Sequence, residues 1–139
     1  MPIILVDTNV LLSGLFFRGN ERRLLEQFLL GKITLVLPEH VLMEATNIIK
    51  RKSNKLGNTE NATAMLSLIT EKCVVVRTAE YAHNLEKAEQ LIRDKKDAPI
   101  LAALMSTGHD YFVSGDKDFE ALNLRTHISV RKLLELIGK

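Results

Sequence analysis

The chain has 139 residues, of which 46% are hydrophobic and 26% are charged. These values are typical of a soluble globular protein, and the length fits a single domain over residues 1–139. The formal net charge of +2 does not indicate nucleic-acid binding by itself, and no apolar run is long enough to cross a membrane.

Short apolar runs alternate with helical patterns along the chain. Ile3–Val6 is wholly apolar, which is typical of a strand covered on both faces of a parallel sheet. Comparable runs predict further strands at residues 33–37, 73–77, 111–114 and 127–130. Apolar residues at helical spacing predict helices at residues 8–17, 20–30, 38–52, 64–70, 81–93, 97–105 and 131–137.

Single residues mark several boundaries of these elements. Asn20 is a favourable N-cap for the second helix and Gly31 a favourable stop, whereas Pro38 fits the first turn of the third helix. The polar residues 53–63 form the clearest predicted loop. Cys73 is expected to be a buried strand residue. As the single cysteine it forms no intramolecular disulfide, and no basic segment precedes the first apolar run, so we expect a cytoplasmic protein.

Strands that alternate with helices predict an α/β protein: a three-layer α/β/α sandwich with a central parallel sheet of four to five strands. Right-handed crossovers place the carboxyl ends of all parallel strands at one edge of the sheet. Asp7 follows the first strand and Asp116 the fourth, so this topology brings them to the same edge. Ligands of open parallel sheets bind at that edge.

Acidic residues occur in four segments associated with this edge. They are Asp7, Glu44, Asp97, and Asp116 with Asp118. Carboxylates that are grouped at one place raise one another's pKa and cost stability unless a cation neutralises them. A group of carboxylates without a cysteine or histidine motif suits a hard divalent cation such as Mg²⁺ or Mn²⁺. The pattern therefore favours metal-assisted hydrolysis of phosphodiester bonds.

Each acidic position also has a structural interpretation. Asp7 and Asp97 both suit the N-cap of the helix that follows, and Asp116 suits an Asx turn. Two acids and a serine directly after a buried strand make the structural interpretation weaker at residues 114–118 than at Asp97.

The segment of residues 39–44 offers more than one ligand. Glu44 falls at the edge of the apolar face of its helix, where it can face a cleft or be an ordinary boundary glutamate. Glu39 is the alternative acid, although the helix dipole explains a glutamate in the first turn. His40 is four residues from Glu44 and able to share a metal with it, but a lone histidine in an oxygen-rich site is more often a neighbour than a ligand.

These residues occur in motifs that resemble those of the PIN domain family over essentially the whole chain. In size, the chain is similar to VapC-type toxins and related small prokaryotic PIN proteins. An apolar strand ending in Asp-Thr-Asn matches residues 6–9, and the motif Ser/Thr-Gly-Asp-x-Asp-Phe/Leu matches residues 114–119. The glutamate after the second strand matches Glu44, and the aspartate that opens an Ala- and Ile-rich helix matches Asp97. Pro38 departs from the Ser or Thr of many relatives, which affects a cap rather than the chemistry.

The resemblance implies a PIN-like fold with Rossmann-like topology and an Mg²⁺- or Mn²⁺-dependent endoribonuclease that is often homodimeric. Its toxin members are held inactive by a partner antitoxin. We expect one or two ions to be held by the catalytic acids Asp7, Glu44, Asp97 and Asp116, with Asp118 as a further metal-binding residue. The residues expected to position water or the scissile phosphate are Thr8, Asn9 and Ser114. The residues expected to contact the RNA backbone are Lys50, Arg51, Lys52 and Lys55, with Arg22 and Arg23 as a second choice.

Other classes of protein match part of this pattern. A catalytically silent PIN-like module that binds RNA or a protein partner retains the acids without cleaving RNA. A phosphotransfer receiver domain needs two acids after the first strand and an aspartate after the third, where this chain has Asp7 alone and Arg77-Thr78. An aspartyl phosphatase needs a second acid where the chain has Asn9. A nucleotide-binding enzyme needs a Gly-rich phosphate loop, and none follows a predicted strand.

Overall fold

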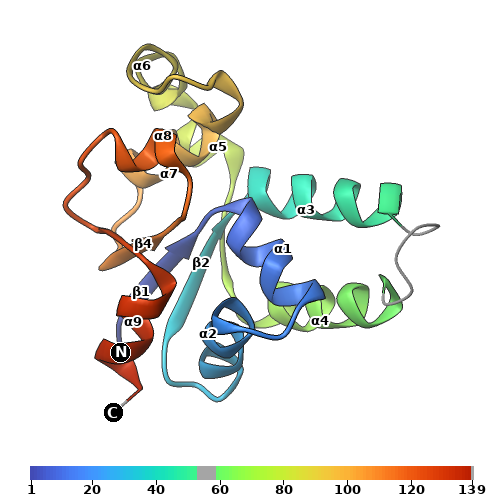
Figure 1. Cartoon of the computed structure of the whole chain (residues 1–139). Helices are drawn as coiled ribbons and strands as arrows, with labels where there is room; N and C mark the ends of the chain where they lie inside the picture. The colour runs from blue at the N-terminus through green and yellow to red at the C-terminus, as the bar shows by residue number, and fades with distance from the viewer. Residues whose placement is uncertain (53–58, 139) are drawn as a thin grey trace.

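The computed structural model describes residues 1–52 and 59–138 of the chain (Figure 1). Its centre is a sheet of five parallel strands in the order β3-β2-β1-β4-β5. The strands are β1 (Ile3–Val6), β2 (Thr34–Pro38), β3 (Val74–Val76), β4 (Tyr111–Val113) and β5 (His127–Ile128). The α/β fold class and the parallel sheet predicted from the sequence are confirmed.

Helices cover both faces of the sheet, which gives the expected three layers (Figure 1). One layer is formed by α1 (Thr8–Phe16), α2 (Asn20–Leu29), α3 (Glu39–Lys52) and α4 (Thr59–Lys72), which contact one another. The other layer contains α5 (Thr78–Tyr81), the 3-10 turn η1 (Ala82–Asn84), α6 (Leu85–Leu91), the 3-10 turn η2 (Lys95–Asp97) and α7 (Ala98–Ser106). After β4, α8 (Lys117–Glu120) leads to β5, and α9 (Val130–Ile137) returns to contact α2.

The apolar residues identified in the sequence form the core. Leu5, Leu35 and Phe112 of the central strands are fully buried. The apolar face of α2 is buried against α1, and α2 ends as predicted because Gly31 adopts a left-handed conformation with φ of +80°. None of the described helices is both long enough and apolar enough to cross a membrane.

Two predicted helix starts are wrong by one position. Pro38 is the last residue of β2, in register with Val76, and α3 begins at Glu39. Because the pairing of β2 with β1 ends at Val36, the missing N–H of Pro38 removes no bond between these strands. Asn20 is the first residue of α2 rather than its cap. The N-cap is Gly19, and no side chain caps this helix.

The predicted loop at residues 53–63 is only partly a loop. Residues 53–58 lie outside the described part of the chain, whereas residues 59–63 belong to α4, which is longer at both ends than the predicted helix. Ala62, in the first turn of α4, is fully buried, and α4 packs against α3. Tertiary packing therefore outweighs the weak helix propensity of the threonines and asparagine.

The predicted helix at residues 81–93 is divided among α5, η1 and α6. At the break, the side-chain amide of Asn84 donates a hydrogen bond of 2.7 Å to Ser106 Oγ in α7. Leu91, predicted to lie on the apolar face, is 53% exposed. Cys73 is half-buried and precedes β3 rather than lying within it. The short helix α8 was not predicted at all.

The strand order reverses between β1 and β4. From β1 the chain moves outwards to β2 and β3, then crosses the sheet and continues with β4 and β5 on the other side of β1. The last residues of the two neighbours, Val6 and Val113, are in register. Asp7 and Ser114 follow them directly. In α/β sheets, ligands bind in the crevice at such a reversal of strand order.

Candidate active site

Asp7 is held at the carboxyl end of β1 and is only 3% exposed. Its Oδ1 accepts the backbone N–H of Val10 at 2.9 Å, so it caps α1, as one interpretation of the sequence predicted. Its Oδ2 accepts the hydroxyl of Ser114, across the β1–β4 boundary, at 2.5 Å. Capping a helix and facing the crevice are therefore compatible roles for this carboxylate.

Ser114 connects β4 to two of the acids. Besides donating to Asp7, its Oγ accepts the backbone N–H of Asp116 at 3.0 Å. Asp116 caps α8, because its Oδ1 accepts the N–H of Asp118 at 2.8 Å. His127 Nε2 lies 2.7 Å from the carbonyl oxygen of Ser114 and so fixes the same turn from β5. The Asx turn after β4 thus positions Asp116 and Asp118 close together.

Asp97 lies near three other acids: Asp7 after β1, Asp116 after β4 and Asp94 in its own segment. It occupies the last position of η2, directly before α7, but its side chain accepts no capping hydrogen bond there. Carboxylate oxygens of Asp97, Asp94 and Asp118 lie within 4.8 Å of one another. Asp97 is also close enough to Asp116 for a hydrogen bond between the two carboxyl groups.

The pKa values show how strongly these groups repel. Burial raises the pKa of Asp97 from 3.8 to about 7, with further increases from Asp116, Asp94 and Asp7. Burial also raises the pKa of Asp7, and Asp116 adds to the increase, although the hydrogen bonds from Ser114 and Val10 and the nearby His127 oppose it. Asp7, Asp94, Asp97, Asp116 and Asp118 therefore form one connected group, which we name the acidic cluster.

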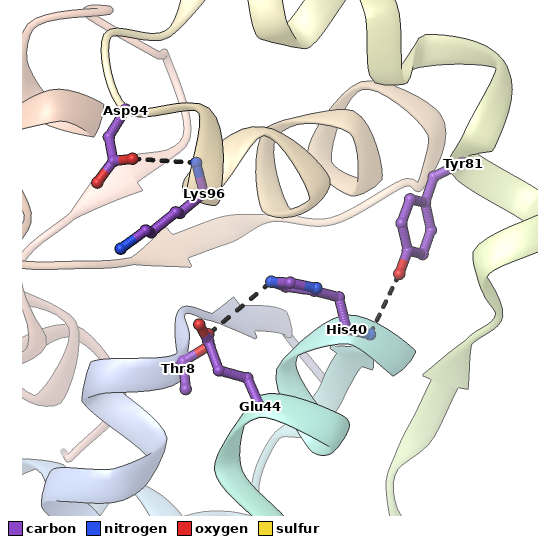
Figure 2. A network of polar contacts seen from close by, with 6 residues as sticks. All are labelled: Thr8, His40, Glu44, Tyr81, Asp94 and Lys96. Carbon is purple, nitrogen blue, oxygen red and sulfur yellow. Dashed lines mark hydrogen bonds and ion pairs between the residues drawn. The ribbon is translucent and has the colours of Figure 1, made fainter. Parts of the chain in front are cut away.

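Glu44 approaches from α3 and is held separately (Figure 2). Thr8, the first residue of α1, donates its hydroxyl to Glu44 Oε1 at 2.5 Å. His40 Nε2 lies 3.9 Å from the same oxygen, one helical turn earlier in α3. The burial of Val41, Ala45 and Ile49 on one face leaves Glu44 at the edge of that face, as predicted. Glu44 is thus tied to the residue next to Asp7 and stands beside the acidic cluster.

An open cleft of about 450 Å³ lies beside Asp7 and Asp116. Asn9, which is exposed, and Ser114 also line it, so these two predicted residues are placed at the crevice. Thr8 is buried. The hydroxyls of Thr8 and Ser114 both donate to carboxylates, so their protons hold acids in place rather than facing the cleft. A second, more apolar cleft of about 440 Å³ lies between α3 and α4 and contains none of the acidic cluster.

The predicted basic patch lies at the far end of α3. Lys50, Arg51 and Lys52 are exposed in its last turn, and Lys55 is outside the described residues. At about 1.5 Å per helical residue, Lys50 and Lys52 lie roughly 9 to 12 Å along the axis from Glu44. Of the second choice, Arg22 donates from Nη2 to the carbonyl of Leu15 at 2.9 Å and also bonds Gly14 from Nε, so it stabilises the end of α1.

Two acids of the site were missed by the sequence analysis. Asp94 caps η2 by accepting the N–H of Lys96 at 3.0 Å, and a 3-10 turn brings residues three positions apart to the same side. The spacing of Asp94 and Asp97 was the signal for this pair. Glu21 lines the cleft beside Asp7 and accepts the Ser13 hydroxyl at 3.4 Å. It lies in the first turn of α2, where the helix dipole offered a sufficient explanation of a glutamate.

The donors of the acidic cluster fit a hard divalent cation. They are carboxylate oxygens, and Cys73 lies elsewhere, before β3. Burial and repulsion both raise the pKa of Asp97, and a cation there would relieve the repulsion. Oxygen donors of this kind suit Mg²⁺ and Mn²⁺ rather than softer metals.

The chain is similar to several known proteins. A family model described as PIN domain matches residues 3–118. PAE2754 from Pyrobaculum aerophilum is 16% identical, with 99% of this chain and 90% of that chain covered and a TM-score of 0.69. VapBC2 from Rickettsia felis, in a structure with a DNA fragment from the VapBC2 promoter, is 16% identical. The match covers 91% of this chain and 98% of that chain, with a TM-score of 0.65.

A third structure is VapC20 from Mycobacterium tuberculosis, described as a sarcin-ricin loop cleaving toxin. It is 22% identical, with 87% of this chain and 95% of that chain covered and a TM-score of 0.58. No curated protein matches the chain by sequence. At these identities, the structural likeness establishes the fold only, and the family model establishes the family to which the chain belongs.

Proposed function

Since the chain belongs to the PIN domain family, we propose that it is a metal-dependent endoribonuclease that hydrolyses RNA phosphodiester bonds. The observation that carries the proposal is the position of Asp97. Burial, together with repulsion from three other carboxylates, raises its pKa to about 7. Carboxylates from the ends of β1 and β4 and from η2 are costly to group in this way, and a cation offsets the cost. The nuclease activity of the family supports the same conclusion.

In the proposed mechanism, Asp7, Asp94, Asp97, Asp116 and Asp118 would hold one or two Mg²⁺ or Mn²⁺ ions, and Glu44 would complete the site from α3. Such ions activate water and neutralise the charge that develops on a phosphate during hydrolysis. Ser114 and Thr8 fix the carboxylates of Asp7 and Glu44 through their hydroxyls. Asn9 faces the cleft and is available to bind water or the scissile phosphate.

The experiment that tests this function compares RNA cleavage by wild type and Asp7→Asn in the presence of Mn²⁺. Asparagine keeps the shape and capping ability of the aspartate but removes its charge. We expect discrete cleavage by wild type and its loss, by at least a hundredfold, in Asp7→Asn and with a chelator.

The matched control for this experiment is Asp110→Asn. Asp110 accepts the N–H of Ile3 at 2.7 Å, at the opposite end of β4 from Asp116. The control should cleave like wild type. RNA that stays intact with folded wild-type protein would favour the alternative, a catalytically silent module that binds RNA or protein.

We further propose that the chain is a homodimeric toxin held inactive by an antitoxin protein. Membership of the PIN family and structural similarity to VapBC2 and VapC20 support this proposal. Expression of wild type alone should arrest growth of the host cell, and Asp7→Asn should not. Light scattering of the purified protein should give the mass of two chains. Normal growth with active nuclease would contradict the toxin role, and the mass of one chain would contradict the dimer.

A further inference from the structure

His40 carries a buried nitrogen atom without a hydrogen-bond partner. Its Nε2 is inaccessible to solvent, although the side chain as a whole is 32% exposed, and no described residue is hydrogen-bonded to this atom. The closest charged atom is Glu44 Oε1 at 3.9 Å, which is too far for a hydrogen bond (Figure 2). A buried polar group without a partner costs about 1 to 3 kcal/mol. This cost is offset if Nε2 gains a hydrogen-bond partner when the site binds a ligand.

The backbone around His40 is firmly held. Its N–H donates to the hydroxyl of Tyr81 at 3.1 Å, and Tyr81 is almost fully buried. Helix α5 therefore anchors the first turn of α3. Because His40 and Glu44 are one turn apart on the same helix, their side chains lie on the same face. The orientation of the imidazole towards Glu44 thus follows from the helix and its anchor.

Among the described residues, Glu44 accepts a hydrogen bond from one donor, whereas Asp7 accepts from two. The groups that shift the pKa values of Asp7 and Asp97 include His127 and other members of the acidic cluster, and Glu44 is not among those named. It is also 37% exposed, more open than Asp7. Thr8 holds one of its oxygens from α1, and His40 points at the same oxygen from α3 (Figure 2). Both of these contacts involve Oε1, and the described residues give Oε2 no hydrogen bond.

We propose that His40 is a positioning residue for Glu44. When a divalent cation occupies the site, His40 Nε2–H donates to Glu44 Oε1, so that Thr8 and His40 together hold the carboxylate with Oε2 towards the ion. The nitrogen–oxygen distance has to shorten by about 1 Å to form this bond, which a small rotation of either side chain achieves. Carboxylates that bind metals are themselves hydrogen-bonded, and loss of such a partner weakens metal affinity by about 10 to 100-fold. The inference rests on the proposed metal-dependent function.

The test measures the Mn²⁺ dissociation constant by the electron paramagnetic resonance of free Mn²⁺, without RNA. We expect His40→Ala to weaken binding about tenfold, and His40→Gln, whose amide N–H reaches a similar position, to stay within about threefold of wild type. In a Glu44→Gln background, His40→Ala should have no further effect, since it acts through Glu44. The control is His83→Ala, an exposed histidine in η1, which should bind Mn²⁺ like wild type.

Thr8 allows the same arrangement to be tested from its other side. Thr8→Val should weaken Mn²⁺ binding and Thr8→Ser should retain it, because only the serine keeps the hydroxyl donor. This pair decides the question if His40→Ala fails to fold, as shown by its circular dichroism. In that case, equal affinity in Thr8→Val and wild type overturns the proposal.

Three results would overturn the inference on His40. They are unchanged affinity in folded His40→Ala, an equal loss in the Glu44→Gln background, and a directly coordinated nitrogen in the electron spin echo spectrum of bound Mn²⁺. The last result would make His40 a ligand rather than a positioning residue. Absence of Mn²⁺ binding by wild type would instead contradict the metal dependence of the proposed function, and the inference with it. The failures of the two proposals are therefore distinguishable.

Discussion

Asp97 receives the repulsion of three other carboxylates, those of Asp116, Asp94 and Asp7. Burial is the main cause of its raised pKa and the repulsion adds to it, so the folded protein holds the Asp97 proton more tightly than the unfolded chain does. The resulting stability is fully present below pH 3.8, the ordinary pKa, and is lost as the pH rises through about 7. At pH 8, the ionised Asp97 therefore makes the metal-free protein less stable than a neutral side chain at this position would.

Asp97→Asn removes this titration. In chelator at pH 8, we expect the variant to be more stable than wild type by about 1 kcal/mol, a figure reduced for solvent screening because Asp97 is only partly buried. The difference should shrink towards pH 4, where the aspartate is protonated in wild type. Thermal melts across this range, with Asp110→Asn as control, measure it. A variant less stable than wild type at pH 8 would contradict the assigned repulsion.

At single positions, the sequence predicted which acids belong to the site better than which groups they bond. Asp7 directly follows β1 and Asp116 follows β4 after two residues, so topology alone was enough to bring them together. Asp94 was missed because its three-residue spacing from Asp97 points to a shared side only in a 3-10 turn, and no such turn was predicted there. The contacts of Thr8 with Glu44 and of Ser114 with Asp7 join residues that are distant in the chain, so no local pattern encodes them.

The pairing of α1 with α2 depends on Gly14. A Cβ atom at this position would lie 2.5 Å from Leu25 Cδ1 and 3.0 Å from the carbonyl oxygen of Glu21. Gly14→Ala should therefore destabilise the protein by about 1 to 3 kcal/mol through overpacking. Chemical denaturation measures the change. Gly108→Ala is the matched control, because its added Cβ meets no atom within 4 Å, and a similar loss there would contradict the packing argument.

The exposed end of α3 is the proposed contact with the RNA backbone. Replacing Arg51 and Lys52 by glutamine should weaken RNA binding at low salt and reduce its salt dependence by about two phosphate contacts. Binding is best measured in Asp7→Asn, which should not cleave the RNA. Lys32→Gln, an exposed lysine just before β2, controls for net charge. An unchanged salt slope would move the binding surface elsewhere.

The elements with a clear local hydrophobic pattern in the sequence were predicted well. β1 is a continuous apolar run, β2 is apolar from Leu35 to Pro38, and α2 has a clear apolar face, so these elements are recognisable from their hydrophobic patterns. The break between α5 and α6 was not predictable, because it is set by the contact of Asn84 with α7. For the same reason, the start of α4 was missed: burial of Ala62 against its neighbours extends a helix that the local sequence does not favour.

The whole molecule is expected to behave as one cooperative unit, since a single core connects both helix layers through the sheet. Calorimetry of the metal-free protein should show one unfolding transition whose calorimetric and van't Hoff enthalpies agree. Mn²⁺ at 100 times its dissociation constant should add about 2.7 kcal/mol without splitting the transition. Two separate transitions would contradict the assignment of residues 1–139 to a single domain.

The neighbouring positions of β1 and β4 have a consequence for the nascent polypeptide during translation. Ser114 and Asp7, which bond across the crevice, are separated by 107 positions. A ribosome that has already released β1, α1 and α3 has produced Asp7 and Glu44, but neither Asp97 nor Asp116. For the proposed nuclease, the nascent polypeptide has no complete acidic cluster until β4 emerges and inserts beside β1. The late position of β4 in the chain would thus delay cleavage of the message until translation has passed it.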